Sequence, residues 1–495
     1  MQQETLTVPA PTTPALTKYS ERPVLRYDKS EWKMPLLFML SMSLVGLEFV
    51  PAILFIAAIL IHQFRHDRYN FVIMLTIFFG GYGLASPSQF PVKPTDLCLT
   101  ASVILAFIYR KNRTEKCLIT CIVCYIAILI FLATYSLESL SVQMLTIRNY
   151  MSILYFIVPV ACFAGRRFDI QVFMHKAVLF VLIMGIFYLV DFFILCGNVL
   201  VPQVFVWGGF YSTFYAPIID PLSFSMSRKY PSGLCIFVLA IFPISRYYRL
   251  AWWQWLILVG AVVVGKTITL LGTFVIAYIF FMGKIKTLIK WSVIGLVGAV
   301  GIYFVDEWIT PKGYRDNIES RLRIKSTVDQ FTALAEIADD EDLARFASGR
   351  MAQILPKFEL VKKEKRQWTG LGFLHLEHTK IPRYIIYNEY YNDWEQREEL
   401  AGAVENVPAT IYIFSGYGGL IAHAVFWLAL WLIVRKKRES AYFTSVLLMC
   451  LLIGMNGMLN TDNFNGLGLI ALSLAAVLLT NKDQKRKNYY APKRI

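Results

Sequence analysis

Apolar residues follow one another along this chain in long blocks, with short polar segments between them. Most of the blocks are about 17–25 residues long, which is the length of a helix that crosses a bilayer. They lie at 35–63, 71–86, 96–109, 117–134, 149–165, 172–197, 231–246, 288–305, 407–434, 441–459 and 463–480. The pattern predicts an all-α polytopic membrane protein.

Composition favours the same class of protein. Of the 495 residues, 56% are hydrophobic and 17% are charged, whereas soluble domains carry about 25% charged residues. The net charge of +15 lies largely in the short segments between apolar blocks, where it orients membrane helices, so we predict no nucleic-acid partner. Cys117, Cys121 and Cys124 have no histidine beside them, and we expect apolar packing there and no metal.

Basic clusters orient the helices, because positively charged short loops stay in the cytoplasm. The clusters lie at 62–68, 110–116, 165–167, 246–249, 284–290, 435–438 and 482–487. An even number of crossings must therefore separate neighbouring clusters. This rule splits the block 35–63 near Glu48 and Pro51, and it splits the apolar stretch 250–283 at an outer turn near Lys266.

The result is about fourteen helices with both termini in the cytoplasm. We expect a disordered cytoplasmic tail at 1–33, a transmembrane bundle at 34–305 with an outer loop at 198–230, a large periplasmic loop with helices at 306–406, C-terminal transmembrane helices at 407–480, and a basic cytoplasmic tail at 481–495. A loop as long as 306–406 exceeds ordinary connection lengths and is more often functional than idle.

Residues 260–267 read GAVVVGKT and satisfy the phosphate-binding pattern G-x-x-x-x-G-K-[ST]. The flanking residues are apolar, and backbone amides in a membrane helix are used within the helix, so they cannot hold a nucleotide. We predict no nucleotide cofactor. Lys266 then either extends towards water or binds an anion at the outer end of two short helices.

Other cations join Lys266 on the predicted outer side. Arg228 and Lys229 directly precede a span, where they either anchor the helix or bind an anion. Arg350 lies in the large loop and either reaches a phosphate or forms a surface ion pair. Together these cations favour an anionic ligand at the headgroup level, such as a lipid phosphate or diphosphate.

Acid–base candidates stand near the same boundary. Glu405 precedes the block 407–434, where partial burial of a carboxylate can raise its pKa and make it a general base. Asn406 either supports this site or caps the next helix. His375 and His378 are the alternative bases on the outer side. Polar residues inside the blocks are also functional candidates because their burial in lipid is costly; they are Glu48, Asp191 and His423.

The chain resembles the bacterial O-antigen polymerase and ligase superfamily, integral membrane glycosyltransferases of the GT-C type. Members have many helices and one large, late periplasmic loop that carries an arginine, an aromatic residue, a proline and Gly-x-Gly. Residues 348–372 are similar, with Arg350, Pro356, Trp368 and the sequence TGLG. The family's loop ends in His-Asn, and the spacing from that histidine to two later glycines matches Glu405-Asn406, Gly416 and Gly419.

The resemblance extends to the cations. The family has an arginine in a turn between two short helices, where this chain has Lys266, and another in the preceding periplasmic loop, as Arg228 is here. Two positions depart from the pattern. Glu405 replaces the histidine thought to activate the acceptor hydroxyl, and Lys266 keeps a positive charge without the bidentate geometry of arginine.

By this resemblance we expect a polymerase that joins polyprenyl-diphosphate-linked oligosaccharide repeat units on the periplasmic face of a bacterial inner membrane. Glycosyl transfer would invert the anomeric carbon and need neither metal nor nucleotide. Glu405 would be the base, and Arg228, Lys266 and Arg350 would hold the diphosphate. Alternatives are a ligase that transfers the finished glycan to a lipid core or protein, and a flippase for the same lipid-linked sugar. A chain-length regulator is an expected partner.

Overall fold

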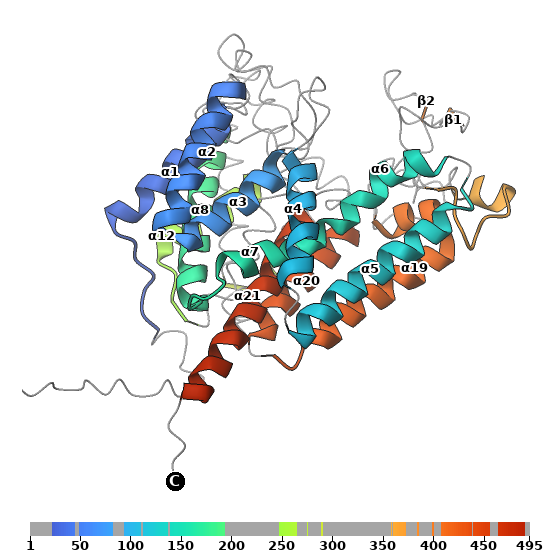
Figure 1. The fold of residues 1–495 in the computed structure, drawn as a ribbon. Coiled ribbons are helices and arrows are strands. Elements are labelled where there is room, and N and C mark those ends of the chain that lie inside the picture. The colour runs from blue at the N-terminus through green and yellow to red at the C-terminus, as the bar shows by residue number, and fades with distance from the viewer. Residues whose placement is uncertain are drawn as a thin grey trace, which may run out of the picture.

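The computed structural model describes residues 22–44, 49–82, 94–109, 112–136, 139–193, 247–264, 358, 360–372, 384–385, 398–399, 407–437, 439–455 and 464–490, together with 275, 289 and 290. Within these residues the chain is mostly helical, as Figure 1 shows. A two-residue antiparallel pair, β1 (Tyr384–Ile385) with β2 (Glu398–Glu399), lies in the segment predicted as the large outer loop.

The described helices follow the predicted apolar blocks closely. In chain order they are α1 (Lys29–Leu44), α2 (Phe49–His66), α3 (Arg68–Tyr82), α4 (Pro94–Tyr109), α5 (Arg113–Ala133), α6 (Leu140–Tyr150), the 3-10 helix η2 (Met151–Phe156), α7 (Ile157–Cys162), α8 (Ile170–Phe193), α12 (Trp252–Val264), α19 (Val407–Val434), α20 (Ser440–Met455) and α21 (Phe464–Tyr490). The predicted split of 35–63 is confirmed as α1 and α2. The blocks 231–246 and 288–305 lie outside the described residues, apart from 289 and 290.

Two helical segments are longer than predicted. The block 149–165 belongs to a segment that starts at α6 and passes through η2 into α7. The 3-10 stretch precedes Pro159, whose ring clashes with the carbonyl of Tyr155 in a regular α-helix. The helix α21 continues to Tyr490 and takes in part of the predicted cytoplasmic tail.

Three described helices are long and apolar enough to cross a membrane: 113–133 in α5, 170–187 in α8 and 408–434 in α19. Their mean hydropathies are 2.6, 2.0 and 1.9. Shorter apolar helices accompany them, at 51–66, 68–79, 97–109, 151–162 and 468–481. Length and composition of the helices thus agree with the membrane class that the sequence indicates.

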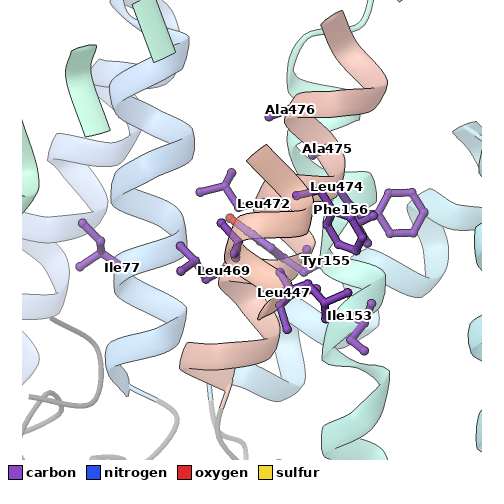
Figure 2. Packing of buried hydrophobic residues seen from close by; sticks show 14 of the residues in the cluster. Ile77, Ile153, Tyr155, Phe156, Leu447, Leu469, Leu472, Leu474, Ala475 and Ala476 are labelled. Atoms are coloured by element: carbon purple, nitrogen blue, oxygen red, sulfur yellow. The ribbon is translucent and has the colours of Figure 1, made fainter. Parts of the chain in front are cut away.

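The helix α21 is the centre of the packed core. Every residue from Leu469 to Leu479 is buried, as expected for a helix that is apolar on all sides and surrounded by others. Figure 2 shows Leu469 and Leu472 of α21 packed beside Tyr155 of η2, with Leu447 of α20 next to them.

Contacts at one end of the bundle bring basic segments together. An Arg68 Nη donates to the carbonyl oxygen of Cys162 at 3.4 Å, and the ring of Tyr248 lies 6.1 Å from that of His175. These contacts place the clusters at 62–68 and 246–249 against residues 162 and 175, which lie on either side of the cluster at 165–167.

The N-terminal segment is ordered from residue 22, which corrects the predicted disordered tail through residue 33. The Leu25 N–H donates to the Arg249 carbonyl at 2.8 Å, and the Arg249 N–H donates to the Pro23 carbonyl at 2.8 Å. The Gln254 side chain donates to the Leu25 carbonyl at 3.2 Å, and Leu25 is buried. Burial of Leu25 and the satisfied backbone hydrogen bonds stabilise this segment despite its polar composition. Residues 1–21 lie outside the described residues.

Tyr27 connects the N-terminal segment to α8 through a hydrogen bond and a ring contact. Its hydroxyl donates to the His175 carbonyl at 2.9 Å, and the two rings lie 4.5 Å apart. The His175 Nε2 lies 3.2 Å from a Glu31 carboxylate oxygen. Burial, and after it the nearby Glu31 charge, raises the pKa of Tyr27 well above its usual 10.0.

Candidate functional site

The helices α5 and α19 form an antiparallel pair, visible side by side in Figure 1. The ring of Tyr125 stacks on that of Phe426 at 4.2 Å, and Leu132, further along α5, faces Gly418, earlier in α19. The basic residues before α5 and after α19 therefore lie at the same end of the pair. The segment 360–372 lies at the opposite end, where it contacts α19 and Ser136, which follows the last residue of α5.

The helix α19 is broken at Gly416, whose backbone angles are φ 63° and ψ −161°. A regular helix would place hydrogen bonds from Tyr417 to the Ile413 carbonyl and from Gly418 to the Phe414 carbonyl. The conformation of Gly416 separates these groups. Two donors and two acceptors in a buried stretch of an apolar helix thus need other partners, since burying an unsatisfied backbone group costs several kcal/mol.

The loop 366–372 supplies all four partners. The Leu371 N–H donates to the Ile413 carbonyl at 2.7 Å, and the Gly372 N–H donates to the Phe414 carbonyl at 2.9 Å. In the other direction, the Tyr417 N–H donates to the Gln367 carbonyl at 2.8 Å. The following N–H, of Gly418, donates to the Trp368 carbonyl at 3.1 Å. The loop therefore completes the broken helix. We call the interruption of α19 at Gly416, together with its hydrogen bonds to this loop, the α19 break.

Glycine is required on both sides of the α19 break. Gly416 has a positive φ, and a Cβ there would lie 2.5 Å from the Gln367 carbonyl oxygen. Gly370, at φ 71°, lies so close that a Cβ would overlap the backbone of Phe414 and Ser415. These glycines let two backbones approach each other and allow conformations that other residues rarely adopt.

Side chains from the end of α5 and from α6 hold the other face of the loop. The Ser136 hydroxyl donates to the Leu371 carbonyl at 2.9 Å, and Gly372 packs against Ser136 and Gln143. Gln143 is buried and donates to the Ala133 carbonyl at 2.8 Å. Leu371 is itself fully buried. Nothing local in the sequence marks these polar residues as partners of a segment more than 200 residues away.

A tight helix end precedes the loop. The helical turn at 360–363 closes with the Arg366 N–H donating to the Val361 carbonyl at 2.9 Å and the Lys365 N–H donating to the Lys362 carbonyl at 3.0 Å. This is the Schellman arrangement, which places its C′ residue in the left-handed region and favours glycine there. That residue is Lys365, at φ 54°. A lysine therefore occupies a position at which glycine would be easier to accommodate.

His423 acts as a polar bridge within the α5–α19 pair. The Trp427 Nε1–H donates to His423 Nε2 at 2.7 Å, so that nitrogen is an acceptor and, in the neutral ring, the proton is on Nδ1. The Nδ1 lies 2.9 Å from the Tyr125 hydroxyl. With both ring nitrogens occupied inside a helix pair, this histidine has a structural role.

The residues predicted to carry chemistry fall mostly outside the described residues. These are Arg228, Lys229, Lys266, Arg350, His378, Glu405 and Asn406. Asp191 lies within α8, and only its backbone is described. Glu405 and Asn406 directly precede the first residue of α19, so they are adjacent in sequence to the helix that contains the break. The predicted Lys266 turn directly follows the last described turn of α12.

The fold brings together two glycine-containing segments that carry the family resemblance. The TGLG segment and Gly416, separated by more than 40 residues, are in direct backbone contact. Gly419 lies three residues beyond the break and packs against the Ser415 side chain. Trp368 is 66% exposed, and its ring lies 5.7 Å from that of Tyr417.

No protein-family model matches the chain, and no curated protein matches it by sequence. Among the described residues, no group of three or more histidine, cysteine, aspartate or glutamate side chains is arranged to hold a metal ion.

Proposed function

We propose that this protein is a membrane glycosyltransferase that joins lipid-linked oligosaccharide repeat units at the membrane surface. The donor is a glycan on polyprenyl diphosphate, and the active site is at the end of α19 that includes the α19 break. This end is opposite the basic segments that flank α5 and α19, so the positive-inside rule favours the periplasmic side. The membrane is the bacterial inner membrane, crossed about fourteen times.

The contact between TGLG and Gly416 is the observation that supports the proposal best. Two stretches that carry the resemblance to O-antigen polymerases and ligases lie far apart in the sequence, and their backbones are hydrogen-bonded to each other in the fold. Their contact holds an inner part of the large loop, residues 366–372, against the helix that begins after Glu405. An active site needs such a rigid support, because a catalytic group must be held close to its productive geometry.

In the proposed reaction, Glu405 accepts the proton of the acceptor hydroxyl as the hydroxyl oxygen attacks the anomeric carbon of the donor. The bond from that carbon to the diphosphate oxygen breaks, and the electron pair leaves with the polyprenyl diphosphate. Arg228, Lys266 and Arg350 stabilise the negative charge that develops on this leaving group. Displacement in one step inverts the anomeric carbon.

A flippase for the same lipid is the second candidate, because interrupted helices line the substrate sites of many transporters. The interruption at Gly416 argues against such a role for α19. In transporters the freed backbone groups contact substrate or ions, whereas here all four are bonded to the loop 366–372. The enzyme therefore remains the preferred function.

The test uses the purified full chain in liposomes with lipid-linked repeat units and no nucleotide. We expect a ladder of longer glycans, resolved by mass. Glu405→Gln keeps the side-chain shape but removes the base, and general-base catalysis contributes about 10²–10⁴-fold to rate, so extension should fall by at least about 100-fold. Asp28→Asn, which alters an exposed carboxylate next to α1, is the matched control.

Three results would contradict the proposal in different ways. Transfer only to an added lipid core or protein would identify a ligase. Movement of the lipid across the bilayer without a new glycosidic bond would identify a flippase. Extension by Glu405→Gln at the rate of the unmodified protein would show that another group is the base, and His378 would be examined next.

A further inference from the structure

The outer surface of the α5–α19 pair carries an apolar stripe. On α19 it consists of exposed residues at helical spacing, namely Tyr417, Ile421, Val425, Leu428 and Leu432. On α5 the exposed apolar residues include Val123, Ile128 and Phe131. Such a stripe faces lipid in a membrane protein, since water would disfavour so much apolar surface.

Aromatic and basic residues mark the two ends of this stripe. At one end, Arg435 lies over the ring of Trp431 at 5.4 Å. At the other, the rings of Trp368 and Tyr417 lie 5.7 Å apart, and they are 66% and 47% exposed. The 18 residues from Tyr417 to Arg435 span about 27 Å of helix, close to the hydrocarbon thickness of about 30 Å. Trp368 therefore lies at the level of the lipid headgroups.

Cations lie next to Trp368 at this level. Lys362, Lys363 and Lys365 are exposed and Arg366 is half-buried. Within the described part of the chain, none of the four forms an ion pair with a carboxylate. Cations beside an aromatic residue at the headgroup level attract the phosphate groups of lipids.

The backbone of Lys365 adds an independent observation. Its left-handed conformation favours glycine, and the lysine side chain is retained there at a cost in stability. Strain of this kind often marks a functional position. The hydrogen bonds of Gln367 and Trp368 to α19 hold the following residues in place, so the cations stand on a fixed support.

We propose that residues 362–368 bind the phosphate group of a lipid in the adjoining leaflet, with Lys362, Lys363, Lys365 and Arg366 contacting the phosphate and Trp368 lying against the headgroup. A polyprenyl diphosphate is the preferred ligand. The choice of polyprenyl diphosphate rests on the proposed function, whereas the binding of a lipid phosphate group at this site does not depend on it. The site would hold the lipid carrier beside the α19 break before the glycan reaches the catalytic residues.

The test measures lipid binding by the full chain with native mass spectrometry. Nanodiscs of phosphatidylcholine contain a small fraction of polyprenyl diphosphate in one series and of phosphatidylglycerol in another. Lys365→Gly removes one cation and relieves the left-handed strain. We expect affinity for polyprenyl diphosphate to fall about fivefold per cation removed, while the melting temperature stays the same or rises. Lys362→Gln combined with Lys363→Gln is a second variant with the same expected direction.

The matched control is Glu439→Gly, which changes another non-glycine residue with positive φ, 61°, at the opposite end of α19. Its lipid affinity should be unchanged. Equal weakening for both lipids would support the phosphate site and identify a phospholipid as its ligand. Unchanged affinity in both lysine variants would overturn the proposal. None of these binding results depends on glycan extension, so a failure of the proposed enzyme would be recognised separately.

Discussion

Substitution of Gly416 by alanine tests whether the loop 366–372 depends on the α19 break. The new methyl group would lie 2.5 Å from the Gln367 carbonyl oxygen, well inside van der Waals contact. The backbone angles of φ 63° and ψ −161° are also almost confined to glycine. Alanine therefore has to straighten α19, move the loop, or do both.

The expected cost follows from these two effects. Backbone strain in this region costs about 1–3 kcal/mol. Displacing the loop also breaks four backbone hydrogen bonds between it and α19. If α19 straightens, its own two hydrogen bonds re-form, and the net loss is two hydrogen bonds at about 1 kcal/mol each. If the loop stays docked, alanine bears the strain and the overlap with Gln367, so we expect the docked form to lose about 3 kcal/mol relative to the free form, a factor of roughly 100 in population.

Hydrogen exchange measured by mass spectrometry is the appropriate assay, because the amides of Leu371 and Gly372 are protected only while the loop is docked. We expect exchange in the peptide 366–372 to accelerate by about 100-fold and glycan extension to fall. Gly165→Ala is the matched control. Gly165 also has a positive φ, 78°, but no atom lies within 4 Å of its added Cβ, so it reports strain alone.

One result would refute this reasoning. If Gly416→Ala changed exchange in 366–372 no more than Gly165→Ala does, the loop would be held by other contacts. The four backbone hydrogen bonds at the α19 break would then not be what holds the loop in place. The proposed function would lose the support that this contact gives it.

Further predictions concern the polar bridge and the N-terminal segment. His423→Leu leaves the buried Trp427 indole N–H without its partner and should lower stability in detergent by about 1–3 kcal/mol, with the pH profile of activity unchanged; a shifted profile would indicate acid–base work instead. Tyr27→Phe removes the hydrogen bond to the His175 carbonyl and should accelerate exchange of the Leu25 amide, at a cost of about 1 kcal/mol. Because burial raises the pKa of Tyr27 above its usual 10.0, the stability from this residue is complete below that pH and is lost as the pH rises towards the higher folded value. Thermal unfolding as a function of alkaline pH should show a smaller loss in Tyr27→Phe.

Much of the helical framework follows from local sequence. The helix predicted over 407–434 has those bounds, because the apolar run, Pro408 at its first turn and the basic cluster after it all act locally. The split of 35–63 also followed from charge and helix length alone. These features depend on neighbouring residues and on the membrane's thickness, both of which a sequence expresses directly.

The α19 break could not be read from the sequence in the same way. The apolar run continues through Gly416 without interruption, and a glycine in a membrane helix equally serves close packing against a neighbour. A helix break at Gly416 and a glycine that serves only close packing differ in whether another segment supplies hydrogen-bond partners for the backbone groups. The sequence indicated that the TGLG segment and Gly416 belong to one motif set, but not that they touch.

By itself, the sequence determined the membrane class, the positions of most described helices and the residues to which chemistry was assigned. Only the tertiary structure decided that α19 is interrupted, that the loop 366–372 completes it, that His423 bridges two helices and that Trp368 is exposed. The physical reason is range. Hydrophobic runs and charge act over a few turns of helix, whereas hydrogen-bond partners and exposure depend on which distant segments the fold brings together.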